Sequence, residues 1–325
     1  RRSHVLSLPR RCLLGASILS RVRNKPPAHV GGLYFLNLKI CYNISMQNKS
    51  SRNKTITVNK EDNFPILELR KEDDYKNKIF FGNCITEMKK LQDGIVDLIV
   101  TDPPYTMYKD FGEGSVSIKE KEFTNWCKEW IDECFRVLKE NGSIYICINW
   151  EASSIIEKLL KKQFTIRNRI TWKRDKGRGA KQNWKNNMED IWYATKSDNY
   201  TFNLENVKIE KQVIAPYVDK KGNPKDWKIV DGKKVRMTHP SNIWTDLVVP
   251  FWSMAENTEH PTQKPEKLIE RIILASSNKN ELVFDPFMGS GTTAVVAKKL
   301  KRNYLGFEIE KRFYNLINKR LLKST

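Results

Sequence analysis

The sequence predicts an α/β domain in which a mainly parallel sheet carries helices on both faces. Short runs rich in β-branched and aromatic residues occur at 78–83, 95–102, 143–149, 281–287 and 303–310. Their near-continuous apolar character is typical of strands that are covered on both sides. Amphipathic stretches separate these runs, and the alternation of strand and helix favours a doubly wound sheet.

The clearest helix is predicted at 122–142. Apolar side chains recur there at helical spacing, at Phe123, Trp126, Trp130 and Cys134. Gly142 follows the last periodic positions and is expected to end the helix.

The pattern changes between residues 173 and 259. This segment is rich in Lys, Arg, Asn, Trp and Gly and has few long apolar runs. We therefore expect it to form an insert or loop-rich module on the sheet domain.

The charge of the chain is strongly positive and unevenly spread. Its 325 residues include 58 Lys and Arg against 38 Asp and Glu, a net charge of +20. Residues 1–60 hold 12 basic residues and no acidic one, which leaves +8 for residues 61–325. A polyanion is the partner that such a charge suggests, although the N-terminal segment supplies part of the signal.

The first 45 residues have the composition of a segment outside the folded domain. They begin without Met, are rich in Arg and contain the short apolar run CLLGASILS. Translated upstream sequence before a start at Met46 is the preferred interpretation, a transit peptide is the alternative, and an ordered extension is the third. We expect residues 1–60 to be a basic extension that is disordered or non-native.

Neither a metal site nor a disulfide framework is expected. The six cysteines lack CxxC spacing and the four histidines are scattered. A reducing, cytoplasmic setting fits this usage best. No run of about 18 apolar residues occurs, so no membrane-spanning segment is expected.

The stretch VFDPFMGSGTTAVVAKKL, residues 283–300, predicts a cofactor site. It reads as a strand, a turn with Gly289 and Gly291, and a helix. Glycines at such a turn let the backbone approach a ligand, and the helix N-terminus offers free N–H groups to a carboxylate or phosphate. About 20 residues further on, the next strand ends at Glu308, which can accept both hydroxyls of a ribose.

The stretch DLIVTDPPYT, residues 97–106, predicts a site for a planar amine. The strand ends in Asp102, Pro103, Pro104 and Tyr105. Two prolines remove the backbone N–H groups, so the turn presents acceptors only. The Asp102 carboxylate and a nearby carbonyl could each accept one N–H of an exocyclic amine while Tyr105 stacks on the attached ring.

The motifs TDPPY, DPFMGSGTT and HPTQKP together resemble the amino-methylating DNA methyltransferases that use S-adenosylmethionine, and their order resembles the β group. The resemblance covers about residues 78–320. It implies a Rossmann-like methyltransferase fold whose sheet of about seven strands includes one antiparallel strand. It divides the chain into a catalytic half at 61–172, a target-recognition region at 173–259 and a cofactor-binding half at 260–325.

Residue by residue, the resemblance implies that Asp102, Pro103, Pro104 and Tyr105 form the catalytic site for the amine and base. Lys264 is expected to balance the cofactor carboxylate. Asn83 and Cys84 stand where the family often has an acid and a small residue or Cys beside the adenine. The expected cofactor contacts are Asn83, Cys84, Asp102, His260, Thr262, Lys264, Asp285, Pro286, Phe287, Gly289, Ser290, Gly291, Thr292 and Glu308.

Contacts with double-stranded DNA are expected from one basic stretch with an aromatic residue in it. Its residues are Lys173, Arg174, Lys176, Arg178, Lys181, Trp184 and Lys185. Because a base inside a duplex cannot reach a recessed pocket, the target nucleotide is expected to rotate out of the stack. No Pro-Cys pair is present for attack on a ring carbon, so direct transfer to an amine is expected.

The resemblance implies N6-methylation of adenine in DNA, as the modification arm of a restriction system or as an orphan enzyme. The leading Asp of DPPY favours adenine. N4-methylation of cytosine, N-methylation of an amide in protein or an amine in RNA, and a non-catalytic DNA-binding subunit remain alternatives. The β-group resemblance also allows a homodimer and a cognate restriction endonuclease as a functional partner.

Overall fold

An eight-stranded sheet forms the centre of the computed structural model, which describes residues 71–104, 120–174, 182, 184–214 and 216–324. These residues belong to one compact unit, Val58–Lys109 with Ser115–Thr325. The expected extension at 1–60 and Tyr105 lie outside the described residues. Among the helices of the described part, none is long and apolar enough to cross a membrane.

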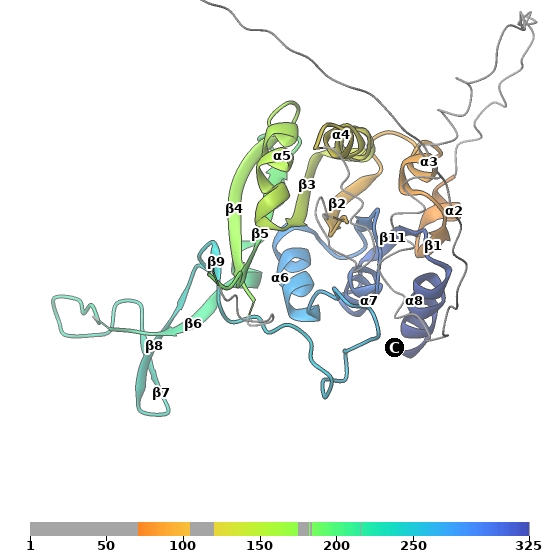
Figure 1. Cartoon of the computed structure of the whole chain (residues 1–325). Coiled ribbons are helices and arrows are strands. Elements are labelled where there is room, and N and C mark those ends of the chain that lie inside the picture. The colour runs from red at the N-terminus through yellow and green to blue at the C-terminus, as the bar shows by residue number, and fades with distance from the viewer. Residues whose placement is uncertain (1–70, 105–119, 175–181, 183, 215, 325) are drawn as a thin grey trace, which may run out of the picture. The chain divides into compact units, whose positions relative to one another are not determined.

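The strands are arranged in the order β1-β11-β10-β2-β3-β5-β4-β9 (Figure 1). β5 is antiparallel to its two neighbours, and the other neighbouring pairs are parallel. The predicted α/β class with one antiparallel strand is confirmed, and the two-residue β9 adds an eighth strand at the edge. The bounds are β1 Lys78–Phe81, β2 Val96–Thr101, β3 Leu138–Ile148, β4 Thr165–Lys173, β5 Met188–Thr195, β9 Ile243–Trp244, β10 Leu282–Asp285 and β11 Asn303–Glu308.

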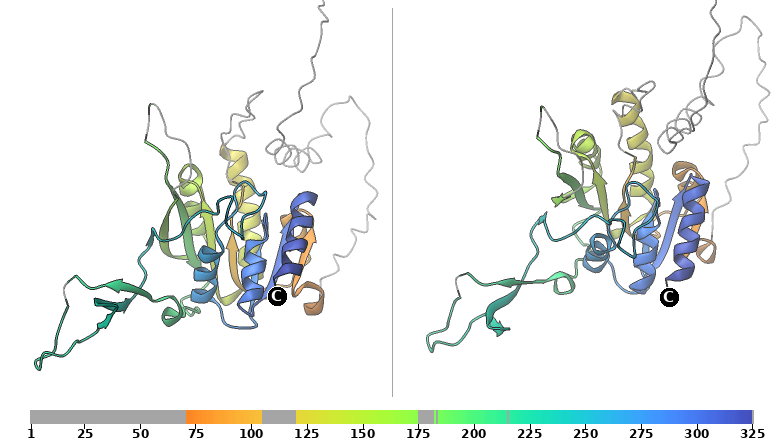
Figure 2. Two further views of the ribbon diagram at one scale, coloured as in Figure 1. Left: turned by 90° about the horizontal axis from the view of Figure 1, so that it is seen from below. Right: turned by 60° about the horizontal axis from the view of Figure 1, so that its bottom comes forward.

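Helices cover both faces of this sheet because alternate strand residues point to opposite sides. Ile144 and Phe284 pack with α3, α4 and α5, whereas Tyr145 and Val283 pack with α6 and α7. α7 and α8 lie side by side, drawn in blue in both views of Figure 2. The bounds are α2 Glu72–Tyr75, α3 Cys84–Met88, α4 Glu120–Val137, α5 Trp150–Leu160, α6 Glu266–Ser276, α7 Thr292–Lys299 and α8 Lys311–Lys323.

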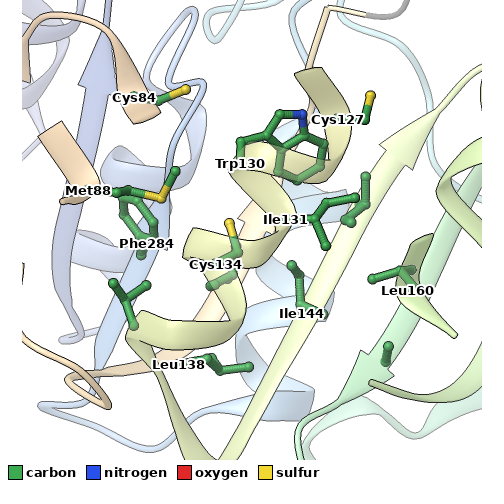
Figure 3. Close-up of a cluster of buried hydrophobic side chains, with 14 of the residues drawn as sticks. Cys84, Met88, Cys127, Trp130, Ile131, Cys134, Leu138, Ile144, Leu160 and Phe284 are labelled. Atoms are coloured by element: carbon green, nitrogen blue, oxygen red, sulfur yellow. The ribbon is translucent and has the colours of Figure 1, made fainter. Parts of the chain in front are cut away.

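The core between α4 and the sheet is assembled from the predicted helical positions. Trp130 and Cys134 of α4 are fully buried and lie over Ile144 of β3 and Phe284 of β10 (Figure 3). Burying such large side chains contributes about 1.5–3 kcal/mol each, which fixes the helix on the sheet.

The prediction that Gly142 ends this helix is wrong. α4 ends at Val137, and Gly142 lies inside β3. The pairing of β2 with β3 is irregular there, since Val96 lies opposite Leu138 but Leu98 lies opposite Ser143. A Cβ on Gly142 would stand 2.6 Å from Cδ1 of Leu138. The glycine therefore permits a close approach within an irregular strand.

The segment 173–259 contains part of the central sheet as well as a module of its own. β5 and β9 belong to the central sheet. The short helix η1 (Leu204–Val207) precedes a separate antiparallel sheet in the order β6-β8-β7. Its strands are β6 Ile209–Gln212, β7 Lys228–Val230 and β8 Lys233–Thr238.

Candidate active site

The two motif-bearing strand ends lie next to each other. β2 pairs with β10 in parallel, with Leu98 opposite Val283. The chain leaves β2 through α4 towards β3 and leaves β10 through α7 towards β11, on the other side of this pair. In open α/β sheets this reversal of strand order marks the place where ligands bind, at the carboxyl ends of the strands. Asp102 and Asp285 lie at these two ends.

Asp285 is a buried carboxylate that joins the two strand ends to α7. Its Oδ1 accepts from Thr101 Oγ1 at 2.9 Å and from the Phe287 backbone N–H at 3.0 Å. Its Oδ2 accepts from Thr293 Oγ1 at 2.8 Å. Burial raises the pKa of Asp285 to about 6, and these hydrogen bonds oppose the shift. The carboxylate thus holds the turn after β10 in place.

The turn between β10 and α7 requires glycine at two positions. Gly289 and Gly291 have φ of 53° and 79°, in the left-handed region that side chains disfavour. A Cβ on Gly291 would also lie 2.9 Å from Cγ2 of Ile317 in α8. Pro286 is buried in this turn, and Phe287 packs edge-on against Trp130 of α4 with ring centroids 5.4 Å apart.

Glu308 is bound to this glycine turn. Its Oε2 accepts from the Gly289 backbone N–H at 2.7 Å, and its Oε1 accepts from the Glu310 backbone N–H at 2.7 Å. Burial raises the pKa of Glu308 to about 7 against these two donors. Glu308 therefore stands at the end of β11, beside the turn, as the sequence spacing predicts.

The structure gives Asn83 and Cys84 local roles. Asn83 caps α3, with its Oδ1 accepting from the backbone N–H groups of Ile85 and Thr86. Cys84 is buried in the core. The adjacent Gly82 donates its N–H to the Glu308 carbonyl, which places this segment next to the end of β11. The expected adenine contacts stay a prediction.

Asp102 forms an ion pair on one oxygen only. Lys264 Nζ lies 2.5 Å from Asp102 Oδ2 and 2.9 Å from Glu189 Oε1. Asp102 Oδ1 is buried and has no hydrogen-bond partner among the described residues. Burial raises the pKa of Asp102 to about 7, with Lys264 opposing the shift and Glu189 adding to it. Among the described residues, Asp102 therefore keeps a buried acceptor for which none supplies a donor.

The HPTQKP segment reaches the site through two of its three candidate residues. Lys264 pairs with Asp102, as described. His260 lies next to the glycine turn, since a Cβ on Gly289 would stand 3.1 Å from Nε2 of His260. Burial lowers the pKa of His260 to about 4, so the imidazole is neutral. Thr262 is exposed. Gln263 fixes the segment by accepting from Thr258 and donating to the Glu256 carbonyl.

Two charged residues at the site were missed by the sequence analysis. Arg320 of α8 donates to the Ser290 carbonyl at 2.7 Å and to Glu266 Oε1 at 3.1 Å, and so ties the glycine turn to the start of α6. Ser290 and Thr292 share a hydrogen bond of 3.0 Å in the same turn. Glu189 of β5 is the other missed residue. Neither stands in a motif, but an acid inside the buried run MEDIWYAT was a usable signal.

The expected DNA-contacting stretch is described in part. Lys173 and Lys185 are exposed, and Trp184 is 93% exposed. Arg174 is half-buried, with its Nη1 at 2.8 Å from Glu189 Oε2. Lys176, Arg178 and Lys181 lie outside the described residues. The DNA contacts of this stretch stay a prediction.

Comparison with known proteins gives a consistent family. A family model described as DNA methylase matches residues 96–319. DNA adenine methyltransferase YhdJ of Escherichia coli (strain K12) is 39% identical over 247 residues, covering 75% of this chain and 82% of that protein. Type II methyltransferase M.HpaI of Haemophilus parainfluenzae is 34% identical over 247 residues, covering 75% and 74% of the two chains.

Solved structures agree with this fold. The M1.HpyAVI–SAM complex has 26% identity and a TM-score of 0.51, covering 75% of this chain and 98% of that one. The PvuII DNA methyltransferase (cytosine-N4-specific) has 16% identity and a TM-score of 0.55, covering 77% and 94%. The second likeness shows the fold alone.

Proposed function

The chain belongs to the N6/N4 amino-methylating DNA methylases, and we propose that it transfers a methyl group from S-adenosylmethionine to the N6 amine of adenine in DNA. The observation that carries this proposal is Asp102 Oδ1, a buried acceptor without a partner among the described residues. It lies at the end of β2, beside the glycine turn that follows β10. An exocyclic amine is a donor that fits it.

The described residues fit S-adenosylmethionine. Glu308 keeps acceptor capacity on both oxygens beside the turn, which suits ribose hydroxyls. Ser290, Gly291 and the first turn of α7 would hold the amino-acid part, since a helix N-terminus favours a carboxylate. Asp285 would act indirectly, because its three hydrogen bonds join the turn to the end of β2 and to α7. The cofactor supplies an electrophilic methyl group, with sulfur keeping the electrons of the bond that breaks.

The residues that follow β2 would prepare the amine for attack. Asp102 Oδ1 would accept one amine N–H, while Pro103 and Pro104 have no backbone N–H to compete for that oxygen. A hydrogen bond to the amine localises electron density on its nitrogen, which becomes a better nucleophile. After transfer the nitrogen must lose a proton, and Asp102, with its pKa raised to about 7, is a suitable acceptor.

Adenine is favoured over cytosine by two features. The motif begins with Asp, and a relative of 39% identity is named a DNA adenine methyltransferase. The Type II names of other relatives support a role as the modification arm of a restriction system. The basic residues at 173–185 and other parts of the segment 173–259 would contact the duplex.

The test is methylation of DNA by the purified protein, followed by mass spectrometry of nucleosides and sequencing that detects modified bases. We expect N6-methyladenine within one short sequence motif. Detection of N4-methylcytosine instead would change the proposed target base from adenine to cytosine. If the protein binds the cofactor but methylates no base amine, the proposal is overturned.

A further inference from the structure

Four charged side chains form a continuous chain that begins at Asp102. Asp102 Oδ2 contacts Lys264 Nζ at 2.5 Å, the same nitrogen lies 2.9 Å from Glu189 Oε1, and Glu189 Oε2 lies 2.8 Å from Arg174 Nη1. We call Asp102, Lys264, Glu189 and Arg174 the charge chain. It joins the end of β2 to the end of β4, through the start of β5 and the segment before α6.

Burial differs along the charge chain. The side chains of Lys264 and Glu189 are 7% and 2% exposed, whereas that of Arg174 is 31% exposed. Breaking a buried pair by removing one partner leaves an uncompensated charge, so the two inner residues depend on each other. The side chain of Asp102 is 18% exposed, so Arg174, at the outer end, is the most exposed member of the charge chain and the one that a phosphate can reach.

Glu189 and Asp102 compete for one ammonium group. Lys264 lowers the pKa of Asp102, and Glu189 raises it. The other titratable groups that face Asp102 are Asp285, whose charge also raises its pKa, and Cys147, a buried thiol whose own pKa is raised well above its usual value. Glu189 therefore sets how strongly the Lys264 charge lowers the pKa of Asp102.

We propose that Glu189 is a positioning residue for methyl transfer, which sets how strongly Lys264 holds Asp102 and makes that hold respond to a DNA phosphate at Arg174. The inference rests on the proposed function. A phosphate that takes the hydrogen bonds of Arg174 leaves Glu189 with a greater share of Lys264. The Oδ2 atom of Asp102 is then held less tightly, and the carboxylate becomes a stronger acceptor for the amine when DNA is in place.

Two substitutions must shift the pH dependence of methyl transfer in opposite directions. In Glu189→Gln the whole Lys264 charge acts on Asp102, so the acidic limb of the single-turnover rate should move down by about one pH unit. The plateau rate should fall about tenfold because the acceptor is weaker. In Lys264→Met the limb should move up by about one unit, because an opposing cation is lost.

Arg174 supplies the test of the link to DNA. In Arg174→Gln, Glu189 has no outer partner even before DNA binds and draws more of Lys264, so the acidic limb of kcat/KM, which reports the free enzyme, should move up by less than in Lys264→Met. The limb of the single-turnover rate with saturating DNA should stay where it is, because a phosphate already occupies Arg174 in the wild-type complex. DNA affinity should fall as well, with a weaker salt dependence. An unmoved limb of kcat/KM in this variant would overturn the link.

Asp190→Asn is the matched control. Asp190 follows Glu189 in β5 and therefore points to the opposite face of the sheet. It is fully buried and pairs with Arg169 at 2.9 Å and with Ser153 at 2.6 Å. The substitution should lower the melting temperature and leave the acidic limb where it is. Cofactor binding by calorimetry checks that each variant is folded.

The outcomes separate the two proposals. Opposite shifts in Glu189→Gln and Lys264→Met, with Asp190→Asn unmoved, support the role of Glu189. Shifts of the same sign, or superimposable profiles in folded variants, overturn it while methylation by the wild type still stands. A wild type that binds cofactor and methylates no base amine overturns the proposed function instead.

Discussion

The ends of β2 and β10 both read Asp-Pro, yet the two carboxylates have different surroundings. Asp285 accepts three hydrogen bonds, from Thr101, Phe287 and Thr293. Asp102 has one oxygen on Lys264 and one buried oxygen without a partner among the described residues. The same dipeptide thus has a fully hydrogen-bonded carboxylate at one strand end and, at the next, a carboxylate with one oxygen unpaired among the described residues. What distinguishes them is the set of donors that each oxygen already has.

Alanine at each of the two positions should give the largest contrast. Asp102→Ala should lower the methyl-transfer rate at least about a thousandfold, with cofactor affinity within a few-fold, because Lys264 keeps Glu189 as a partner. Asp285→Ala should instead lower the free energy of unfolding by about 3 kcal/mol, since buried donors lose their acceptor. Single-turnover kinetics, calorimetry and urea unfolding measure these effects. Equal losses of cofactor affinity in both variants would contradict the contrast.

The pH dependence of stability sharpens the same comparison. Burial raises the pKa of Asp285 from 3.8 to about 6, so the folded protein binds more protons than the unfolded chain between these values. Stability contributed by this group is therefore complete below about pH 4, falls as the pH rises to about 6, and is constant above. Relative to Asp285→Asn, the wild type should lose about 3 kcal/mol over that range.

Urea unfolding of both proteins at several pH values checks this expectation. The comparison removes the contributions of groups that titrate alike in the two proteins. A difference in unfolding free energy that is independent of pH would mean that Asp285 titrates normally in the folded state.

The strand ends were predictable because their signals are local. An apolar run followed by Asp-Pro or by Gly-x-Gly specifies a buried strand and a turn, and the parallel order of the strands brings the two ends together. The position of Glu308 at the end of β11 was predictable for the same reason, because it follows from the local spacing between two strands. Local sequence also misled in one case, since Gly142 permits a close approach to Leu138 within β3, whereas a glycine after an amphipathic stretch usually ends the helix.

Glu189 and Asp190 show what the sequence left open, since the acids in a buried run are visible there but their partners are not. They are buried acids at the start of β5, within a segment that the sequence analysis interpreted as an insert. Each is compensated by residues from other elements: Arg169 lies 21 residues away in the chain, and Lys264 lies on the segment before α6. A buried charge in a strand is tolerated when such partners compensate it. These partners come from distant parts of the chain, so only the tertiary structure shows whether they are present.

The glycine turn after β10 allows a smaller and sharper test. Gly291 and Gly222 have φ of 79° and 85°, but a Cβ would meet Ile317 at 2.9 Å in the first and nothing within 4 Å in the second. Alanine at either position bears the cost of a left-handed backbone, about 1 kcal/mol. Gly291→Ala should cost about 1–2 kcal/mol more, because α8 must move away. It should also weaken cofactor binding, which Gly222→Ala should leave unchanged.

Thermal or urea unfolding and calorimetry of the two variants separate these contributions. Equal destabilisation would show that α8 yields without cost and that glycine is needed at 291 for its backbone conformation alone. Normal cofactor affinity in a destabilised Gly291→Ala would assign the turn to packing against α8. The role in chemistry would then rest on Asp102 Oδ1, the buried oxygen that has no partner among the described residues.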